Sequence, residues 1–244
     1  MSAFFRHYRQ LAVIGSLLFG TCVCLGLFAL RMARIHSFFD GGMIWNLFLA
    51  WLPALSALAA YNLRQTHSVL RWITISGFVL VWLLFLPNAP YLITDIMHLQ
   101  PRPEIPYWFD LILYVAFAWT GSFLGLVSLL LIQEVVRHAA GALASWLFIL
   151  GVLALNSFGI YLGRFLRWNS WDVIVNPLPL FTEIAQQVRH PVAHFQTVVF
   201  SVLFTFFFLA AYLMLVAVTR FHAELQTQQP TRPIRAKPAR ARVR

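Results

Sequence analysis

The sequence predicts an all-α polytopic membrane helix bundle with about six transmembrane helices. Three observations support this prediction. Of the 244 residues, 60% are hydrophobic and only 11% are charged, whereas soluble domains are nearer half apolar and a quarter charged. Six apolar stretches are separated by polar segments, and most approach the roughly 20 residues that cross a bilayer. The chain also carries a net charge of +10, and its basic residues lie mainly between or after the apolar stretches.

The six expected helices share a nearly continuous apolar composition. They span residues 11–30, 43–61, 72–86, 111–132, 143–162 and 197–219. The first follows two arginines, as a signal peptide would, but it is too long for a signal-peptide core, so we expect an uncleaved span. The third is short and is followed by Pro87 and Pro90, each of which lacks a backbone donor. We therefore expect a re-entrant or broken segment over residues 87–99, in which Asn88 caps a short helix.

The chain divides into a transmembrane helical domain, residues 1–219, and a basic tail, residues 220–244. The tail contains seven of the 18 basic residues and three prolines with few apolar residues, so we expect it to be disordered. In the cytoplasm it would lie beside anionic lipid head groups. We expect no nucleic-acid partner, because no aromatic residue interleaves with the tail charges after Phe221.

The distribution of Lys and Arg predicts the orientation. Twelve lie on the side of the two termini and six on the opposite side, which puts both termini in the cytoplasm. Without the tail the counts are five and six, so the tail supplies the bias. The outer side then holds most of the acidic residues, namely Asp40, Asp95, Glu104, Asp110, Asp172 and Glu183. The sequence thus places any chemical face of the protein on the outer side.

Asp95 and His98 are candidate catalytic residues in the segment after the third helix. Three positions apart, they share one face if the segment is helical. A carboxylate and an imidazole so placed could be a base with its orienting partner, or two metal ligands. Two ligands do not define a metal site, so Asp95 and His98 are only weak metal candidates and we expect no cofactor. The structural alternative, which we favour, is an Asp–His hydrogen bond or an Asp–Arg pair that holds the segment in place.

A second polar segment, residues 159–172, follows the fifth helix. Arg164 and Arg167 are three positions apart and are expected to share a face, where guanidinium groups could grip a phosphate or carboxylate. Trp168 and Trp171 are expected at the level of the lipid head groups. A turn or helix cap is expected at Asn169, Ser170 and Asp172. In the structural alternative, Arg164 or Arg167 neutralises Asp95 or Asp172.

Because the two segments emerge on the same side, they could meet around one pocket, which is a hypothesis that the sequence leaves open. The candidate binding residues of this pocket are Asn88, Tyr91, Arg164, Arg167, Asn169 and Asp172. Such a set would suit an anionic ligand, for example a lipid phosphate.

Four small residues and two amides within the helices are expected to pack helices together. Gly121/Gly125 and Gly159/Gly163 both fit the G-x-x-x-G pattern, which lets helix backbones approach closely. Asn46 and Asn156 are expected to form hydrogen bonds between helices.

The two polar segments also carry a family resemblance. LPNAPYLITDIMHL at residues 86–99, Asp110 and GIYLGRFLRWNSWD at residues 159–172 resemble an uncharacterised bacterial family of multi-pass membrane proteins, domain of unknown function 1361. The resemblance implies a bacterial inner (plasma) membrane location. It implies no substrate, cofactor or site residue, because none has been assigned to that family.

Four functions remain in competition. We favour a membrane scaffold or complex subunit, with possible membrane-protein partners, since structural ion pairs often imitate active sites. The alternative is a site that binds or acts on an anionic lipid or envelope metabolite at the outer membrane–water boundary. Transport and intramembrane proteolysis rank lower, because the spans offer few polar groups and no paired acids or Ser–His pattern. Enzymatic and non-enzymatic roles both stay open.

Overall fold

The computed structural model describes the backbone of residues 3–35, 41–64 and 70–228, and the side chains from 10 to 225 within these ranges. Asp40 and residues 229–244 of the expected tail lie outside the described residues. The regular structure of the described part is helical, apart from an isolated bridge between Arg102 and Ile105.

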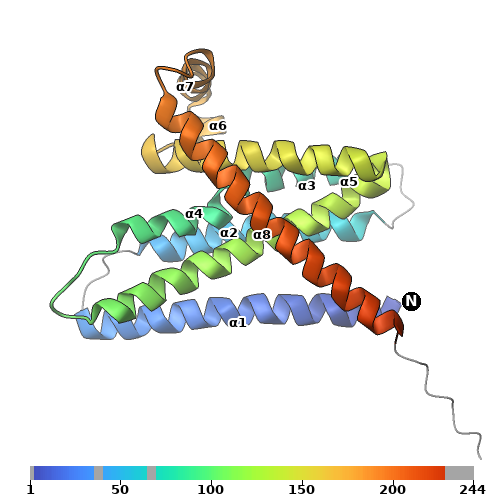
Figure 1. The fold of residues 1–244 in the computed structure, drawn as a ribbon, viewed down its shortest axis with the longest axis horizontal. Coiled ribbons are helices and arrows are strands. Elements are labelled where there is room, and N and C mark those ends of the chain that lie inside the picture. Colours follow the sequence, from blue (N-terminus) through green and yellow to red (C-terminus); the bar gives the residue numbers. More distant parts are fainter. Residues whose placement is uncertain (1–2, 36–40, 65–69, 229–244) are drawn as a thin grey trace, which may run out of the picture.

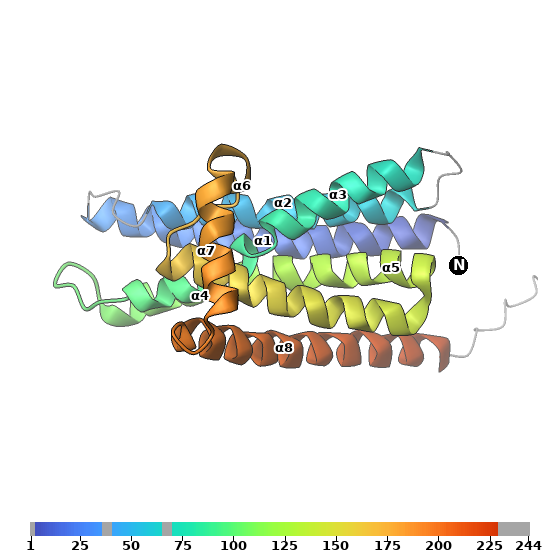
Figure 2. The ribbon, with the colours of Figure 1, turned by 90° about the horizontal axis from the view of Figure 1, so that it is seen from above.

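The elements form a bundle of long helices with short ones at one end (Figures 1 and 2). In chain order they are α1 (Ala3–Ile35), α2 (Gly42–Leu63), α3 (Arg71–Phe85), α4 (Asn88–Thr94), the 3₁₀ helix η1 (Asp95–His98), α5 (Tyr107–Phe165), α6 (Asp172–Val175), α7 (Pro177–Arg189) and α8 (Phe195–Gln228). Five helical stretches of the described chain are long and apolar enough to cross a membrane: α1, α2, α3 together with α4 and η1, α5, and α8. The protein is an all-α membrane helix bundle, as the composition predicts.

Helix α5 contains two of the six expected spans. It is interrupted at Gly141, where φ is 88° and ψ is 176°, a backbone conformation that glycine adopts without a steric penalty. The second half of α5 then returns toward the end at which the first half began (Figure 1). The start of α1 and the end of α8 lie at the opposite end of the bundle, together with the turn between the two halves of α5 (Figure 2).

The segment after α3 is a broken helix. Leu86 and Pro87 interrupt the helix, and α4 and η1 then continue toward the far end of the bundle (Figure 2). The prediction that Asn88 caps α4 is wrong by one position. Pro87 is the N-cap and Asn88 is the first residue of the helix. The Asn88 side chain instead donates to the carbonyl of Phe85 and the hydroxyl of Ser170.

The first half of α5 packs against α4 through its pair of glycines. A Cβ at Gly121 would collide with the carbonyl oxygen of Ala89 and the side chain of Leu92. One at Gly125 would lie 3.3 Å from the Cβ of Ala89. Only hydrogen fits at Gly121, so this half of the G-x-x-x-G prediction describes a close approach of two backbones.

The second half of α5 packs against the broken segment through a second pair of glycines, Gly159 and Gly163. A Cβ at Gly159 would lie 2.8 Å from the Cγ of Pro87, and one at Gly163 would lie 3.2 Å from the ring of Tyr91. Both G-x-x-x-G pairs therefore face the broken segment, which is held between the two halves of α5.

Two hydrophobic clusters form the interior. One joins α2, α3, α5 and α8 around Trp82, whose Nε1 donates to the Oγ of Ser128 over 3.0 Å. The other joins α1, α2, α4 and α5 around Phe28 and Phe117. Helix α8 lies diagonally across α5 (Figure 1) and continues to Gln228, nine residues into the segment expected to be tail.

Helix α7 runs across the bundle rather than along it (Figure 2). Its buried residues are Leu180 and Gln187. The Gln187 side chain accepts a hydrogen bond from Thr197 at the start of α8 over 2.6 Å. Leu178 and Phe181 of the same helix are exposed, as expected of a helix that lies in the plane of a membrane interface.

Candidate functional site

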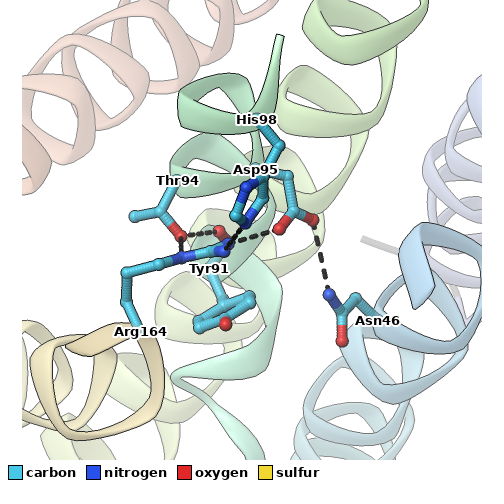
Figure 3. A network of polar contacts seen from close by, with 6 residues as sticks. All are labelled: Asn46, Tyr91, Thr94, Asp95, His98 and Arg164. Atoms are coloured by element: carbon cyan, nitrogen blue, oxygen red, sulfur yellow. Dashed lines mark hydrogen bonds and ion pairs between the residues drawn. The ribbon is translucent and has the colours of Figure 1, made fainter. Parts of the chain in front are cut away.

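The two polar segments meet, and an ion pair between Arg164 and Asp95 joins them (Figure 3). Arg164 lies in the last turn of α5, and Asp95 begins η1 directly after α4. The two side chains are only 8% and 7% exposed. Because a buried charge is tolerated when it is paired and hydrogen-bonded, this pair fixes the end of α5 against the broken segment.

Arg164 uses its remaining donors on neighbours in the same segment. Its Nε donates to the Oγ1 of Thr94 over 2.7 Å, and an Nη lies 2.6 Å from the Nε2 of His98. Arginine can only donate, so the His98 Nε2 accepts and the ring proton lies on Nδ1. The guanidinium carbon lies 4.2 Å from the centre of the Tyr91 ring, in the range of a cation–π contact.

Asp95 and His98 thus share a partner, but that partner is the guanidinium of Arg164. The second carboxylate oxygen of Asp95 accepts from the Nδ2 of Asn46 on α2 over 3.3 Å, so the predicted interhelical role of Asn46 is confirmed. In the described part of the chain, no group of three or more His, Cys, Asp or Glu residues could hold a metal ion. The contacts are those of the structural alternative, an Asp–Arg pair that joins α2, α4 and α5.

The prediction that Arg164 and Arg167 share a helical face is wrong. Helix α5 ends at Phe165, and Arg167 adopts a left-handed conformation with φ of 60°. A left-handed residue just after a helix reverses the chain direction, and the N–H of Trp168 donates back to the carbonyl of Leu162 over 3.1 Å. Arg167 is exposed and lies outside the network around Arg164.

Ser170 and Asn88 fasten the segment after α5 to the break between α3 and α4. The Nδ2 of Asn88 donates to the Oγ of Ser170 over 2.9 Å and to the carbonyl of Phe85 over 3.1 Å. The Ser170 hydroxyl donates to the carbonyl of Leu84 over 2.9 Å. These bonds use backbone carbonyls that the broken helix leaves free.

Asp172 organises the turn that enters α6, as expected. Its carboxylate accepts from the backbone N–H of Asn169 over 2.7 Å and from the side chain of Asn176 over 3.4 Å. Asp172 is 8% exposed. Its role is to stabilise the local turn, and Arg164 pairs with Asp95 instead.

A cavity of about 610 Å³ lies beside this network. Helices α2, α3, α4, the second half of α5, the turn after it, α6 and α7 all contribute to its walls. The lining residues are Trp45, Asn46, Leu49, Leu80, Leu83, Leu84, Pro87, Asn88, Tyr91, Leu155, Asn156, Gly159, Leu162, Gly163, Trp168, Asn169, Ser170, Trp171, Val173, Leu180 and Ile184. Leu80 of α3 and Leu155 of α5 line the cavity and are 67% and 58% exposed, so the cavity opens on the side of the bundle.

Asn156 occupies the wall of this cavity and also borders a void of about 10 Å³ beneath it. It is 4% exposed, and its Oδ1 has no hydrogen-bond partner in the described structure. The sequence predicted a hydrogen bond between helices, and that prediction is wrong for this oxygen. A buried acceptor without a partner costs about 1–3 kcal/mol, which makes it a candidate contact for a bound molecule.

The sequence reasoning missed a second buried ion pair. Arg31 at the end of α1 is 1% exposed, and its Nε lies 2.9 Å from the Oδ1 of Asp110 at the start of α5. Two opposite charges at the same end of two apolar spans were the available signal. The sequence also missed Thr94, which has no characteristic pattern. Of the residues proposed to surround one pocket, Asn88, Tyr91 and Asn169 line the cavity, whereas Arg164, Arg167 and Asp172 do not.

Comparison with known proteins gives one family match. Residues 45–211 match the model of a family described as "Protein of unknown function (DUF1361)". This range contains the Asp95–Arg164 network and all the residues that line the cavity. The curated proteins and the solved structures give no match.

Proposed function

Because the chain belongs to the DUF1361 family, which has no known function, we propose its role from its geometry: it binds a membrane lipid in the cavity between α3 and the second half of α5. The observation that carries this proposal is the cavity itself, with its volume of about 610 Å³. Ligand sites commonly have volumes of about 300–1,000 Å³ and combine apolar walls with a few polar groups.

The walls of the cavity suit an amphipathic molecule. Leucines from α3 and α5 supply much of its apolar lining, and asparagines from α2, α4 and α5 supply polar groups. The exposed residues Leu80 and Leu155 lie at its lateral opening. A lipid could therefore enter from the bilayer without crossing water, which would otherwise cost about 0.8 kcal/mol for each exposed CH₂ group.

In this proposal Asp95 and Arg164 are positioning residues. Their ion pair holds α4 against α5, and Tyr91, which the guanidinium contacts, lines the cavity. Arg164 is neutralised by Asp95, so an anionic head group at the outer boundary would depend on the exposed Arg167 beside Trp168. Any catalytic role of Asp95 or His98 stays a prediction.

One observation favours the second candidate, a membrane scaffold or complex subunit. The Asp95–Arg164 network makes its contacts inside the protein, with Thr94, His98 and Asn46. Such a network stabilises a fixed arrangement of helices, which is what a scaffold requires. The two candidates differ in whether the cavity is occupied.

We propose a bacterial inner membrane location with both termini in the cytoplasm. The support is the count of basic residues in the sequence, twelve on the side expected to hold both termini and six on the other. The cavity would then lie toward the outer boundary of the membrane, and the tail would meet anionic head groups on the inner one.

Lipid retention in native mass spectrometry tests the proposal. The wild-type protein, released from its membrane in a mild detergent, should retain lipid in a defined ratio. Leu83→Trp should lose it, because Leu83 lines the cavity and is half-buried. Leu147→Trp is the matched control, because Leu147 is on α5, is 61% exposed and lies outside the cavity. Equal retention by both variants would exclude the cavity and favour the scaffold.

A further inference from the structure

The chemistry of the cavity indicates which lipid head group it takes, and this inference rests on the proposed lipid binding. Among the described residues that line it there is no Asp, Glu, Lys, Arg or His. A phosphate or ammonium group in the cavity would lose its hydration without meeting an opposite charge, which is strongly unfavourable. The lining therefore disfavours a charged head group.

Four asparagines supply most of the polar side chains of the lining: Asn46, Asn88, Asn156 and Asn169. A side-chain amide offers two donors on its nitrogen and an acceptor on its oxygen. The contacts that each amide makes within the protein decide which of these remain for a ligand.

Three of the four amides are oriented by partners that can only accept. The Nδ2 of Asn46 faces the carboxylate of Asp95, and that of Asn169 faces the carboxylate of Asp172. The Nδ2 of Asn88 faces the carbonyl of Phe85. A carboxylate or carbonyl cannot accept from an amide oxygen, so these contacts fix which end of each amide is the nitrogen.

The unused capacity of the asparagines includes all four oxygens, and the Nδ2 of Asn46 and of Asn169 each keeps one N–H without a partner in the described structure. Within the described structure no contact uses the Oδ1 of Asn46, Asn88 or Asn169, and the Oδ1 of Asn156 is buried without a partner. Four acceptors call for a ligand that presents several donors. A phosphate has only acceptors at neutral pH and a primary amine is charged, whereas a hydroxyl group donates, accepts and carries no charge.

Aromatic rings also line the cavity. Trp45, Tyr91, Trp168 and Trp171 line it alongside the asparagines. Such rings present a broad apolar face with one polar atom at the edge, a surface that suits the C–H face of a sugar ring. We infer that the cavity binds the uncharged, polyhydroxyl head group of a glycolipid, whose hydroxyls donate to the asparagine oxygens.

The test uses full-length protein in phosphatidylcholine nanodiscs, after purification in a detergent without a sugar head group. Monoglucosyl diacylglycerol and phosphatidic acid with the same acyl chains are added in equal amounts, and the lipids bound to the protein are counted by native mass spectrometry. The wild type should retain the glucosyl lipid about tenfold over phosphatidic acid, as one or more extra hydrogen bonds would provide. This comparison requires no variant.

Asn156→Leu should reduce binding of the glucosyl lipid by about tenfold. Asn62→Leu is the matched control, because Asn62 lies on α2 outside the cavity, and it should bind as the wild type does. Melting temperatures of both variants within a few degrees of the wild type would exclude misfolding. Unchanged binding by Asn156→Leu would contradict the inference.

The outcomes separate this inference from the proposed function. Equal or preferred binding of phosphatidic acid, abolished by Leu83→Trp, would overturn the glycolipid inference and leave lipid binding intact. If the wild type retains neither lipid more than the Leu83→Trp variant does, both the glycolipid inference and the proposed lipid binding would be overturned. Methyl glucoside added alone distinguishes a free sugar from a lipid. If native mass spectrometry shows that it binds at the same concentration as the glucosyl lipid does, the ligand would be a free sugar and the lipid would be excluded.

Discussion

Arg164 pairs with Asp95 across 69 positions of the chain, and the pair closes the end of α5 onto the broken helix that follows α3. Both residues are largely buried at one end of an otherwise apolar bundle. The same end holds the buried pair of Arg31 and Asp110. The chain has only eight acidic residues, and two of them, Asp95 and Asp110, each form a buried ion pair with an arginine.

Asp95→Asn should destabilise the protein strongly. The substitution removes the charge that compensates the buried Arg164, and breaking one partner of a buried pair costs about 3–5 kcal/mol. The measurement is the melting temperature of the detergent-solubilised protein. Glu134→Gln is the control, because Glu134 pairs with Arg137 at the surface, where the two side chains are 36% and 59% exposed, and should cost about 1 kcal/mol or less. Equal effects of the two variants would refute the structural role of Asp95.

Gly121→Ala should displace α4. The added Cβ would meet the Ala89 carbonyl oxygen, a backbone atom that cannot move by a rotamer change. Overpacking of this kind costs about 1–3 kcal/mol, which a shift in thermal or denaturant unfolding would reveal.

Gly151→Ala is the matched control for Gly121→Ala. It lies on α5 as well, and a Cβ there meets nothing within 4 Å. Alanine is favoured over glycine in a helix by about 1 kcal/mol, so this variant should be as stable as the wild type or more stable. A tolerated Gly121→Ala would contradict the close packing of α4.

Ser170→Ala should loosen the segment that covers the cavity. The Ser170 hydroxyl donates to Leu84 and accepts from Asn88, and each lost hydrogen bond is worth about 1 kcal/mol. Hydrogen exchange of residues 166–184 should become faster while that of α1 is unchanged. Thr182→Ala on α7 removes only an exposed bond to Leu178 of the same helix and should have little effect. Unchanged exchange in Ser170→Ala would show that other contacts hold the cover.

The orientation of the bundle can be tested by labelling single cysteines. In a chain with Cys22→Ser and Cys24→Ala, a membrane-impermeant maleimide added to intact cells should modify Glu104→Cys, which precedes α5. It should modify Ala140→Cys, beside the turn at Gly141, only after the membrane is opened. The opposite pattern would invert the proposed orientation, and equal labelling of both positions would contradict a membrane-spanning first half of α5.

The sequence by itself was enough to predict the helix bundle. A helix satisfies its backbone hydrogen bonds within one segment, and lipid requires long apolar stretches, so both features can be read locally. The prediction of a break after α3 is equally local, because Pro87 and Pro90 lack the donors of a regular helix. The residues of the two polar segments could be selected in the same way, since polar groups are rare in an apolar chain.

Only the tertiary structure decided how these residues are used. Spacing predicted that Arg164 and Arg167 share a helical face. The helix α5 ends at Phe165, and Arg167 adopts a left-handed conformation beyond it, so of the two arginines only Arg164 reaches Asp95. The cavity lies between the side chains of six separate helices, α2 to α7, and the Oδ1 of Asn156 has no hydrogen-bond partner in the described structure. Both depend on packing between residues distant in the chain, and a local sequence pattern carries no information about that packing.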